Sequence, residues 1–159
     1  MFRGPRGCMF ITAGNIYRSD DGVGPYIGEM LAPHAEGLTM FKIVNAGVSP
    51  EDHIDTIVGL SPGFVVFIDA AQFNGKPGEM ILLDEDAGLP DYSLSTHTLP
   101  LNLMAALIKS ECPAAFFYIG IQSASLEFGE ELSLSVQKAA DLLINEIVQR
   151  IENKDDIYA

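Results

Sequence analysis

Short apolar runs alternate with amphipathic segments along this 159-residue chain. Five runs have the length and the β-branched or aromatic content of buried strands, and they cover residues 8–13, 41–45, 64–68, 79–83 and 115–121. Helices are predicted between and after these runs, over residues 23–31, 49–58, 100–109 and 133–151. The alternation is typical of an α/β fold, in which helices cover both faces of a largely parallel sheet.

One strand should break the parallel arrangement. The turn Gly75-Lys76-Pro77-Gly78 separates the strand at 64–68 from the strand at 79–83. This connection is too short for the crossover that joins two parallel strands. We therefore expect the strand at 79–83 to run antiparallel to its neighbour.

Two of the predicted helices carry clear local signals. Ser49-Pro50-Glu51-Asp52 has the composition of a helix N-terminus, with a serine cap, proline at the first helical position and acids in the first turn. The last helix has apolar residues at helical spacing on one face, which we expect to pack in the core. They are Val136, Ala139, Ala140, Leu143, Ile144, Ile147, Val148 and Ile151. The tail that follows this helix, at 152–159, is predicted to fray.

The length suits a single domain with a substantial core, which we place at 1–159 with its core at about 7–151. The apolar runs fall far below the roughly 18 to 20 residues that span a bilayer, so no membrane insertion is expected. No secretory signal is recognisable. Cys8 and Cys112 form neither a Cys-x-x-Cys pair nor a disulfide framework, which favours a reducing cytoplasm. We expect a monomer.

The formal net charge of −13 disfavours two classes of partner. A chain this acidic repels nucleic-acid phosphates and anionic lipids. A cationic or metal-bearing partner is electrostatically easier, although the same acidity also serves solubility.

Acidic side chains follow two of the predicted strands. Asp20 and Asp21 lie in the loop after the first strand, and Asp69 directly follows the third apolar run. The carboxyl ends of parallel strands meet at one edge of a sheet, so these acids can converge there. His97, in a long irregular loop, could join them. Carboxylates and an imidazole suit a borderline divalent metal ion, with positions left open for a second molecule.

Each of these residues also has a plainer explanation. Asp20 and Asp21 could stabilise a helix dipole, at roughly 0.3 to 1 kcal/mol per charge, and only one of the two needs to face inward. His97 could cap the helix that follows it. Asp69 favours the functional interpretation, because a charged residue that ends a fully apolar strand usually has a partner.

Several other site classes lack their defining residues. A phosphoacceptor signalling domain needs a lysine at the end of its last strand, where Ile119-Gly120-Ile121-Gln122 has none. A phosphohydrolase that uses an Asp-x-Asp motif needs a second acid, and Asp69-Ala70-Ala71 has alanine at that position. The phosphate-binding Gly-x-x-x-x-Gly-Lys loop and the glycine-rich dinucleotide fingerprint are also absent from the sequence. Cofactor-dependent redox chemistry is therefore not expected.

Three motifs occur in order: Gly14-Asn15 with Asp20-Asp21-Gly22-Val23-Gly24-Pro25, then Phe67-Ile68-Asp69-Ala70, then Thr96-His97-Thr98-Leu99-Pro100-Leu101. Two shorter segments accompany them, Gly120-Ile121-Gln122 and Val148-Gln149-Arg150-Ile151-Glu152. Together these motifs resemble those of the nickel-dependent maturation endopeptidases of [NiFe] hydrogenases, in particular the type that serves the hydrogenase 3 large subunit.

This resemblance implies a fold, a reaction and a set of ligands. The fold would be a three-layer α/β/α sandwich around a twisted, mostly parallel five-stranded sheet. The reaction would be a single cut that removes the C-terminal extension of a [NiFe]-hydrogenase large-subunit precursor after nickel insertion. The precursor would be the protein partner and would deliver the nickel. The family's metal-binding and catalytic positions fall on Asp21, Asp69 and His97.

The chain departs from the family pattern at two places. Relatives usually have Gly-x-Gly-Asn where this chain has Thr12-Ala13-Gly14-Asn15. They carry an aspartate before a glycine pair where this chain has Asn45-Ala46-Gly47. Neither change removes a proposed ligand, so activity is expected.

Two other functions stay open at this point. The same residues could belong to a noncatalytic checkpoint or chaperone that binds the nickel-loaded precursor without cutting it. They could also belong to a metal-dependent hydrolase of small esters or peptides. The motif match disfavours the hydrolase because it implies a protein substrate.

Overall fold

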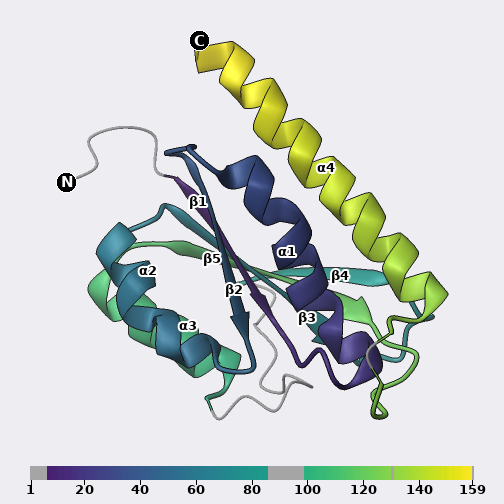
Figure 1. The fold of residues 1–159 in the computed structure, drawn as a ribbon. Helices are drawn as coiled ribbons and strands as arrows, with labels where there is room; N and C mark the ends of the chain where they lie inside the picture. Colours follow the sequence, from purple (N-terminus) through teal and green to yellow (C-terminus); the bar gives the residue numbers. More distant parts are fainter. Residues whose placement is uncertain (1–6, 86–98, 130, 159) are drawn as a thin grey trace.

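The computed structural model describes residues 7–85, 99–129 and 131–158 and is built around a twisted five-stranded sheet (Figure 1). The strand order is β2-β1-β3-β5-β4, and every neighbouring pair is parallel except β4 and β5. The predicted sheet with one antiparallel strand is confirmed, and the neighbour of that strand is β5. The strands are β1 (Cys8–Ala13), β2 (Phe41–Gly47), β3 (Phe64–Ala71), β4 (Met80–Asp84) and β5 (Ala115–Gln122).

Helices cover both faces of this sheet. Figure 1 shows α1 and α4 on one face and α2 and α3 on the other. The predicted three-layer α/β/α sandwich is therefore confirmed. The helices of the described chain are α1 (Val23–Ala35), α2 (Ile54–Leu60), α3 (Leu101–Glu111) and α4 (Leu134–Tyr158), with short 3-10 helices η1 (Ser19–Gly22) and η2 (Pro50–His53).

Alternate residues of the central strands pack against the two helical layers. In β1, Met9 and Ile11 belong to the core cluster beneath α2 and α3, whereas Phe10 belongs to the cluster beneath α1 and α4. In β3, Phe67 and Ile68 divide in the same way. Each central strand buries both of its faces, which is why its sequence is a continuous apolar run.

Helix α4 is longer than the sequence predicts. It continues to Tyr158, so the segment from residue 152, for which the sequence predicts fraying, is helical. Its predicted inward face is confirmed, with Val136, Ala140 and Ile151 buried against the sheet and α1. Propagating an established helix costs little compared with starting one, which accounts for the extension. No helix among the described residues is both long and apolar enough to cross a bilayer.

The second predicted helix begins differently from expectation. Its first turn is the 3-10 helix η2, in which the Asp52 N–H donates to the Ser49 carbonyl at 3.1 Å. The Ser49 side chain makes no capping hydrogen bond to the described residues, so the predicted serine cap is wrong. Pro50 does occupy the first helical position, as predicted.

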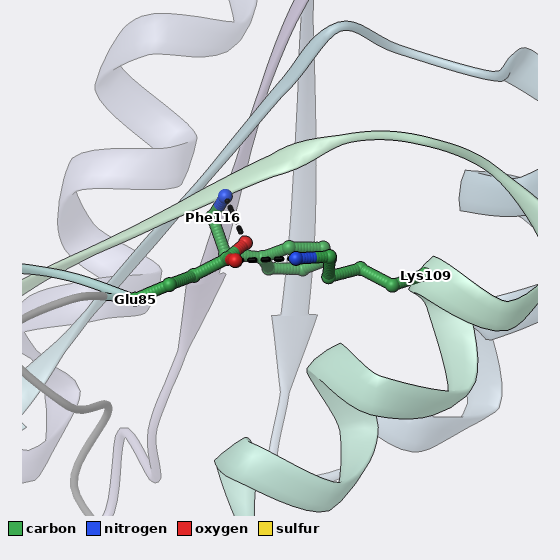
Figure 2. Close-up of polar contacts among 3 residues, drawn as sticks. All are labelled: Glu85, Lys109 and Phe116. Carbon is green, nitrogen blue, oxygen red and sulfur yellow. Dashed lines mark hydrogen bonds and ion pairs between the residues drawn. The ribbon is translucent and has the colours of Figure 1, made fainter.

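Glu85 fixes the chain at the end of β4 (Figure 2). Because β4 is antiparallel, it ends at the edge where the parallel strands begin, with Asp84 opposite Phe117. Glu85 Oε1 accepts a hydrogen bond from the Phe116 N–H at 3.0 Å, and Oε2 forms an ion pair with Lys109 Nζ of α3. This contact joins β4, β5 and α3.

We expect the two halves of this contact to differ in strength. Lys109→Met removes only a half-exposed ion pair and should lower the free energy of unfolding by less than about 1 kcal/mol. Glu85→Ala also takes the acceptor from the Phe116 N–H and should cost roughly 1 to 3 kcal/mol. Urea denaturation of both variants measures the difference. Equal losses would mean that the bond to Phe116 contributes nothing.

Candidate functional site

The loop after β1 and the end of β3 meet where the strand order reverses. From β1 the chain passes to β2 on one side and then crosses to β3 on the other. Thr12 pairs with Ile68, so Asp69 lies one residue beyond that pair. Helix η1, which contains Asp20 and Asp21, packs against β3. Such a switch point, at the carboxyl ends of the strands, is where ligands bind in open α/β sheets.

Two glycines allow the first loop to fold tightly over the end of β1. Gly14 has a φ of +143°, and a Cβ there would lie 1.9 Å from the Asp21 carbonyl oxygen. A Cβ at Gly24, in the first turn of α1, would lie 2.0 Å from the Ala13 carbonyl oxygen. Any larger residue at these positions would push η1 or α1 away from the strand ends. The two glycines therefore keep Asp21 close to the sheet.

The Asp20 carboxylate holds a second loop, the one that follows β5. Asp20 is fully buried. Its Oδ2 accepts hydrogen bonds from the N–H groups of Ala124 at 2.7 Å and Ser125 at 3.0 Å. Its Oδ1 accepts from the N–H and the hydroxyl of Ser133, at 2.7 and 2.9 Å. Asp20 therefore has a structural role, in line with the plainer of the two explanations. It acts by accepting hydrogen bonds from a loop distant in the sequence, and not only by stabilising a helix dipole.

Backbone hydrogen bonds also join the loop after β1 to the loop after β5. The Ser19 N–H donates to the Gly129 carbonyl at 2.7 Å, and the Gly129 N–H donates to the Tyr17 carbonyl at 3.0 Å. We call the two joined segments, residues 14–22 and 123–129, the loop pair. The loop pair forms one ordered unit at the carboxyl edge of the sheet.

Asp21 and Asp69 are buried at this same edge. Asp21 is fully buried and Asp69 is 4% exposed. Asp69 also lines a small cavity together with Ala13, at the end of β1, and Leu99. Burial of an ionised carboxylate is costly unless donors or a cation offset it, so buried acids gathered at one strand edge are typical of functional sites. The structure thus places two of the three predicted site residues, both buried, at the same edge of the sheet.

His97 lies outside the described residues. Leu99, two positions later in the sequence, lines the cavity beside Asp69. Within the described part of the chain, no three His, Cys, Asp or Glu side chains form a group that could hold a metal ion. The complete triad therefore stays a prediction.

The two departures from the family pattern contact each other. Thr12 Oγ1 donates to Asn45 Oδ1 at 3.3 Å, and Asn45 Nδ2 donates to the Pro25 carbonyl at 3.2 Å. Thr12 is fully buried. The pair joins β1, β2 and α1 next to the site, so the two departures form one local arrangement.

Gln122 is a site-building residue that the sequence signals only weakly, as a polar residue that ends an apolar strand. It is 4% exposed at the end of β5, opposite Ala71. Its Oε1 accepts hydrogen bonds from the N–H groups of Phe73 at 2.9 Å and Gly75 at 3.2 Å, and its Nε2 donates to Gln72 Oε1 at 2.6 Å. Gln122 thereby fixes the loop that follows β3.

One segment has the spacing of a nucleophile elbow but the wrong structural context. Gly59-Leu60-Ser61-Pro62-Gly63 matches Gly-x-Ser-x-Gly. An elbow joins a strand to a following helix, whereas Ser61 follows α2 and precedes β3, at the edge opposite Asp69. Its φ of +45° belongs to a helix C-cap, so Ser61 is no candidate nucleophile.

A large apolar cavity, of about 770 Å³, also lies away from the predicted site. It is lined by Cys8 and Phe64, at the beginnings of β1 and β3, and by Ile147 of α4. None of the described residues that line it belongs to the predicted site. The chemistry of the carboxylates therefore does not involve this cavity.

Comparison with protein families identifies the chain. Residues 25–150 match the HycI family model, which describes hydrogenase maturation proteases. The chain belongs to this family. The resemblance read from the sequence is therefore confirmed, and the chain is a peptidase.

Individual relatives of the protease agree with this assignment. A putative hydrogenase maturation protease of Methanocaldococcus jannaschii is 30% identical over 150 residues, covering 91% of this chain and 88% of that protein. The hydrogenase 3 maturation protease of Escherichia coli K12 is 27% identical over 144 residues, covering 91% and 88%. The crystal structure of a [NiFe] hydrogenase maturation protease HycI from Thermococcus kodakarensis superposes with a TM-score of 0.83 at 31% identity, covering 95% and 96%.

A polar contact also joins α1 to α4 beside the loop pair. The Tyr26 hydroxyl donates to Asp141 Oδ1 at 2.7 Å. This bond to a carboxylate stabilises the neutral phenol, and together with burial and the charge of Asp141 it raises the pKa of Tyr26 above its usual value of 10.0.

The raised pKa sets the pH dependence of this contact. The stabilisation is fully present below the unfolded-state pKa of 10.0 and is lost as pH rises through the higher folded-state pKa of Tyr26. We expect Asp141→Asn to lower the pKa of Tyr26 in an ultraviolet titration, with Tyr26→Phe identifying the signal. An unchanged titration in Asp141→Asn would contradict the assigned cause.

The Asp20 carboxylate should contribute strongly to the stability of the fold. Asp20→Ala removes the acceptor for the N–H groups of Ala124, Ser125 and Ser133 and should lower the free energy of unfolding by roughly 2 to 4 kcal/mol, because buried donors lose their partner. Thermal unfolding of the variant measures this contribution. Ser133→Ala, which removes only the hydroxyl bond to Asp20, should lower the melting temperature by a smaller amount. A melting temperature equal to that of the wild type would show that Asp20 does not hold the loop.

Proposed function

We propose that this protease removes the C-terminal extension of a [NiFe]-hydrogenase large-subunit precursor after nickel insertion, and that Asp21, Asp69 and His97 recognise the nickel. The observation that carries the proposal is the burial of Asp21 and Asp69 at the switch point of the sheet. The names of the relatives support the substrate class, since they process hydrogenase 3 or mature a [NiFe] hydrogenase.

The donor set suits a borderline divalent ion. Asp21 and Asp69 offer carboxylate oxygens, and His97 would add an imidazole nitrogen. Leu99 beside Asp69 supports the inclusion of His97, because two residues span at most about 7 Å. Three protein donors leave positions for groups of the precursor, so the nickel would arrive as part of the substrate.

The three residues would act mainly by positioning. By holding the metal-bearing end of the precursor, they would place the adjacent peptide bond at the carboxyl edge of the sheet. Fixed geometry of this kind supplies a large part of a catalysed rate. A bound divalent ion can also polarise a carbonyl or activate a water molecule.

The setting of the reaction follows from composition. The sequence has only two cysteines, Cys8 and Cys112, and they form no Cys-x-x-Cys pair, a usage typical of a reducing compartment. We propose that the protease acts in the cytoplasm as a monomer. The net charge of −13 favours a metal-bearing protein partner over nucleic acid.

Mass spectrometry of a nickel-loaded precursor incubated with the protease tests this proposal. We expect a single C-terminal cut with the wild type and none with nickel-free precursor. Asp21→Asn and His97→Ala should each slow the cut by at least about 100-fold, because each removes a proposed metal ligand.

Matched variants separate loss of function from loss of fold. Asp55→Asn on the exposed face of α2 and His34→Ala near the end of α1 make the same chemical changes away from the site and should cut normally. Cutting of the nickel-free precursor, or full activity of Asp21→Asn, would contradict the metal role. Binding without any cut would favour the checkpoint function.

A further inference from the structure

An open groove of about 520 Å³ begins next to the candidate site, and the proposed metal chemistry makes no use of it. Gly22, the residue after Asp21, is part of its lining. The apolar lining includes Ile16 and Tyr17 from the first loop and Leu132 from the segment before α4. The groove is therefore continuous with the place where Asp21 is held.

Large apolar side chains stand exposed in the lining of this groove, at Ile16 and Tyr17, and on the adjoining segment, at Phe128. Ile16 is 51% exposed, Tyr17 is 58% exposed and Phe128 is 93% exposed. Phe128 precedes Gly129, whose N–H donates to the Tyr17 carbonyl, so the two aromatic residues stand on joined backbone segments. We call Ile16, Tyr17 and Phe128 the apolar rim.

The apolar rim is exposed on an ordered scaffold. A single exposed apolar residue is common. Here, however, the Asp20 hydrogen bonds hold the loop pair that carries all three. Aromatic side chains carried on a backbone that is held in advance cost less conformational entropy on binding than those on a loop that must first be ordered, and aromatic residues often anchor protein interfaces.

The charged residues around the rim are mostly acidic, with three glutamates and one arginine among those described. Among the described residues that line the groove, Glu29 alone carries a charge. Glu127 and Glu131 are exposed on either side of Phe128 in the sequence. The nearby Arg18 is hydrogen-bonded through Nε to a carbonyl of the loop pair, at 3.2 Å. The groove therefore favours a partner segment that presents an apolar side chain with a cation beside it.

We propose that this groove docks a segment of the precursor that presents a large apolar side chain next to a lysine or arginine, apart from the metal site. The apolar side chain packs against the rim, and the cation pairs with Glu29. This inference rests on the proposed function and deepens it, because it names a substrate feature read outside the metal-binding residues. Continuity of the groove with Gly22 connects the two regions.

Steady-state processing of the nickel-loaded precursor tests the docking site through Phe128→Ser and Glu29→Lys. Each variant should raise KM by about 10-fold or more, since each removes an anchor of the interface. The value of kcat should stay within about twofold, because a contact made equally in the ground state and the transition state affects only KM. Glu29→Lys should also weaken the salt dependence of KM.

Two control variants make the same changes elsewhere. Leu142→Ser removes an apolar side chain that is 64% exposed on α4, and Glu36→Lys reverses a charge at the opposite end of α1 from the site. Both should keep the wild-type KM. Circular dichroism checks the fold of every variant, and the 93% exposure of Phe128 means that its substitution removes little packing.

The outcomes separate this inference from the function on which it rests. A wild-type protein that fails to cut the precursor refutes the proposed function. A wild-type protein that cuts, with KM unchanged in both Phe128→Ser and Glu29→Lys, overturns the docking site alone. A fall in kcat at constant KM also overturns it, because the residues would then act on the chemical step or the fold.

Discussion

The hydrogen bonds that Asp20 accepts determine how the carboxyl edge of this protein is assembled. They join residues that lie 104 to 113 positions apart in the sequence. A buried carboxylate without donors would be strongly destabilising, so η1 and the loop after β5 must be in place together. These bonds join the two segments of the loop pair, and together with the close fit at Gly14 and Gly24 they set the position of Asp21.

The Asp20 hydrogen bonds also explain how two adjacent acids acquire different roles. Asp20 and Asp21 lie in the 3-10 helix η1, where successive residues point in directions about 120° apart because a turn contains three residues. The Asp20 carboxylate faces the loop after β5. The next side chain along the helix therefore faces elsewhere, and the close fit at Gly14 and Gly24 keeps it near the strand ends.

The edge of the sheet where the parallel strands begin and the edge where they end differ in the residues that they carry. Where the parallel strands begin, Glu85 joins β4, β5 and α3, and the contacts there are structural. Where they end, buried carboxylates, a hydrogen-bonded glutamine and an open groove lie at the strand ends and in the loops that follow them. Glu85 lies at the first edge, and Leu99 lines the cavity beside Asp69 at the second. A rigid core of strands that are apolar on both faces supports this division.

The sequence by itself determined the elements of the fold and marked Asp69, because strands buried on both faces must be apolar and a charge that ends such a strand is conspicuous. It also determined that β4 is antiparallel, since the connection before it is too short for a crossover. Only the tertiary structure decided that Asp20 is structural, that β4 pairs with β5 and that Gln122 fixes the loop after β3. The tertiary structure likewise placed Phe128 beside Tyr17. These features depend on hydrogen bonds between residues remote in the chain, and a local pattern of polar and apolar residues does not specify which distant partner a buried polar group will meet.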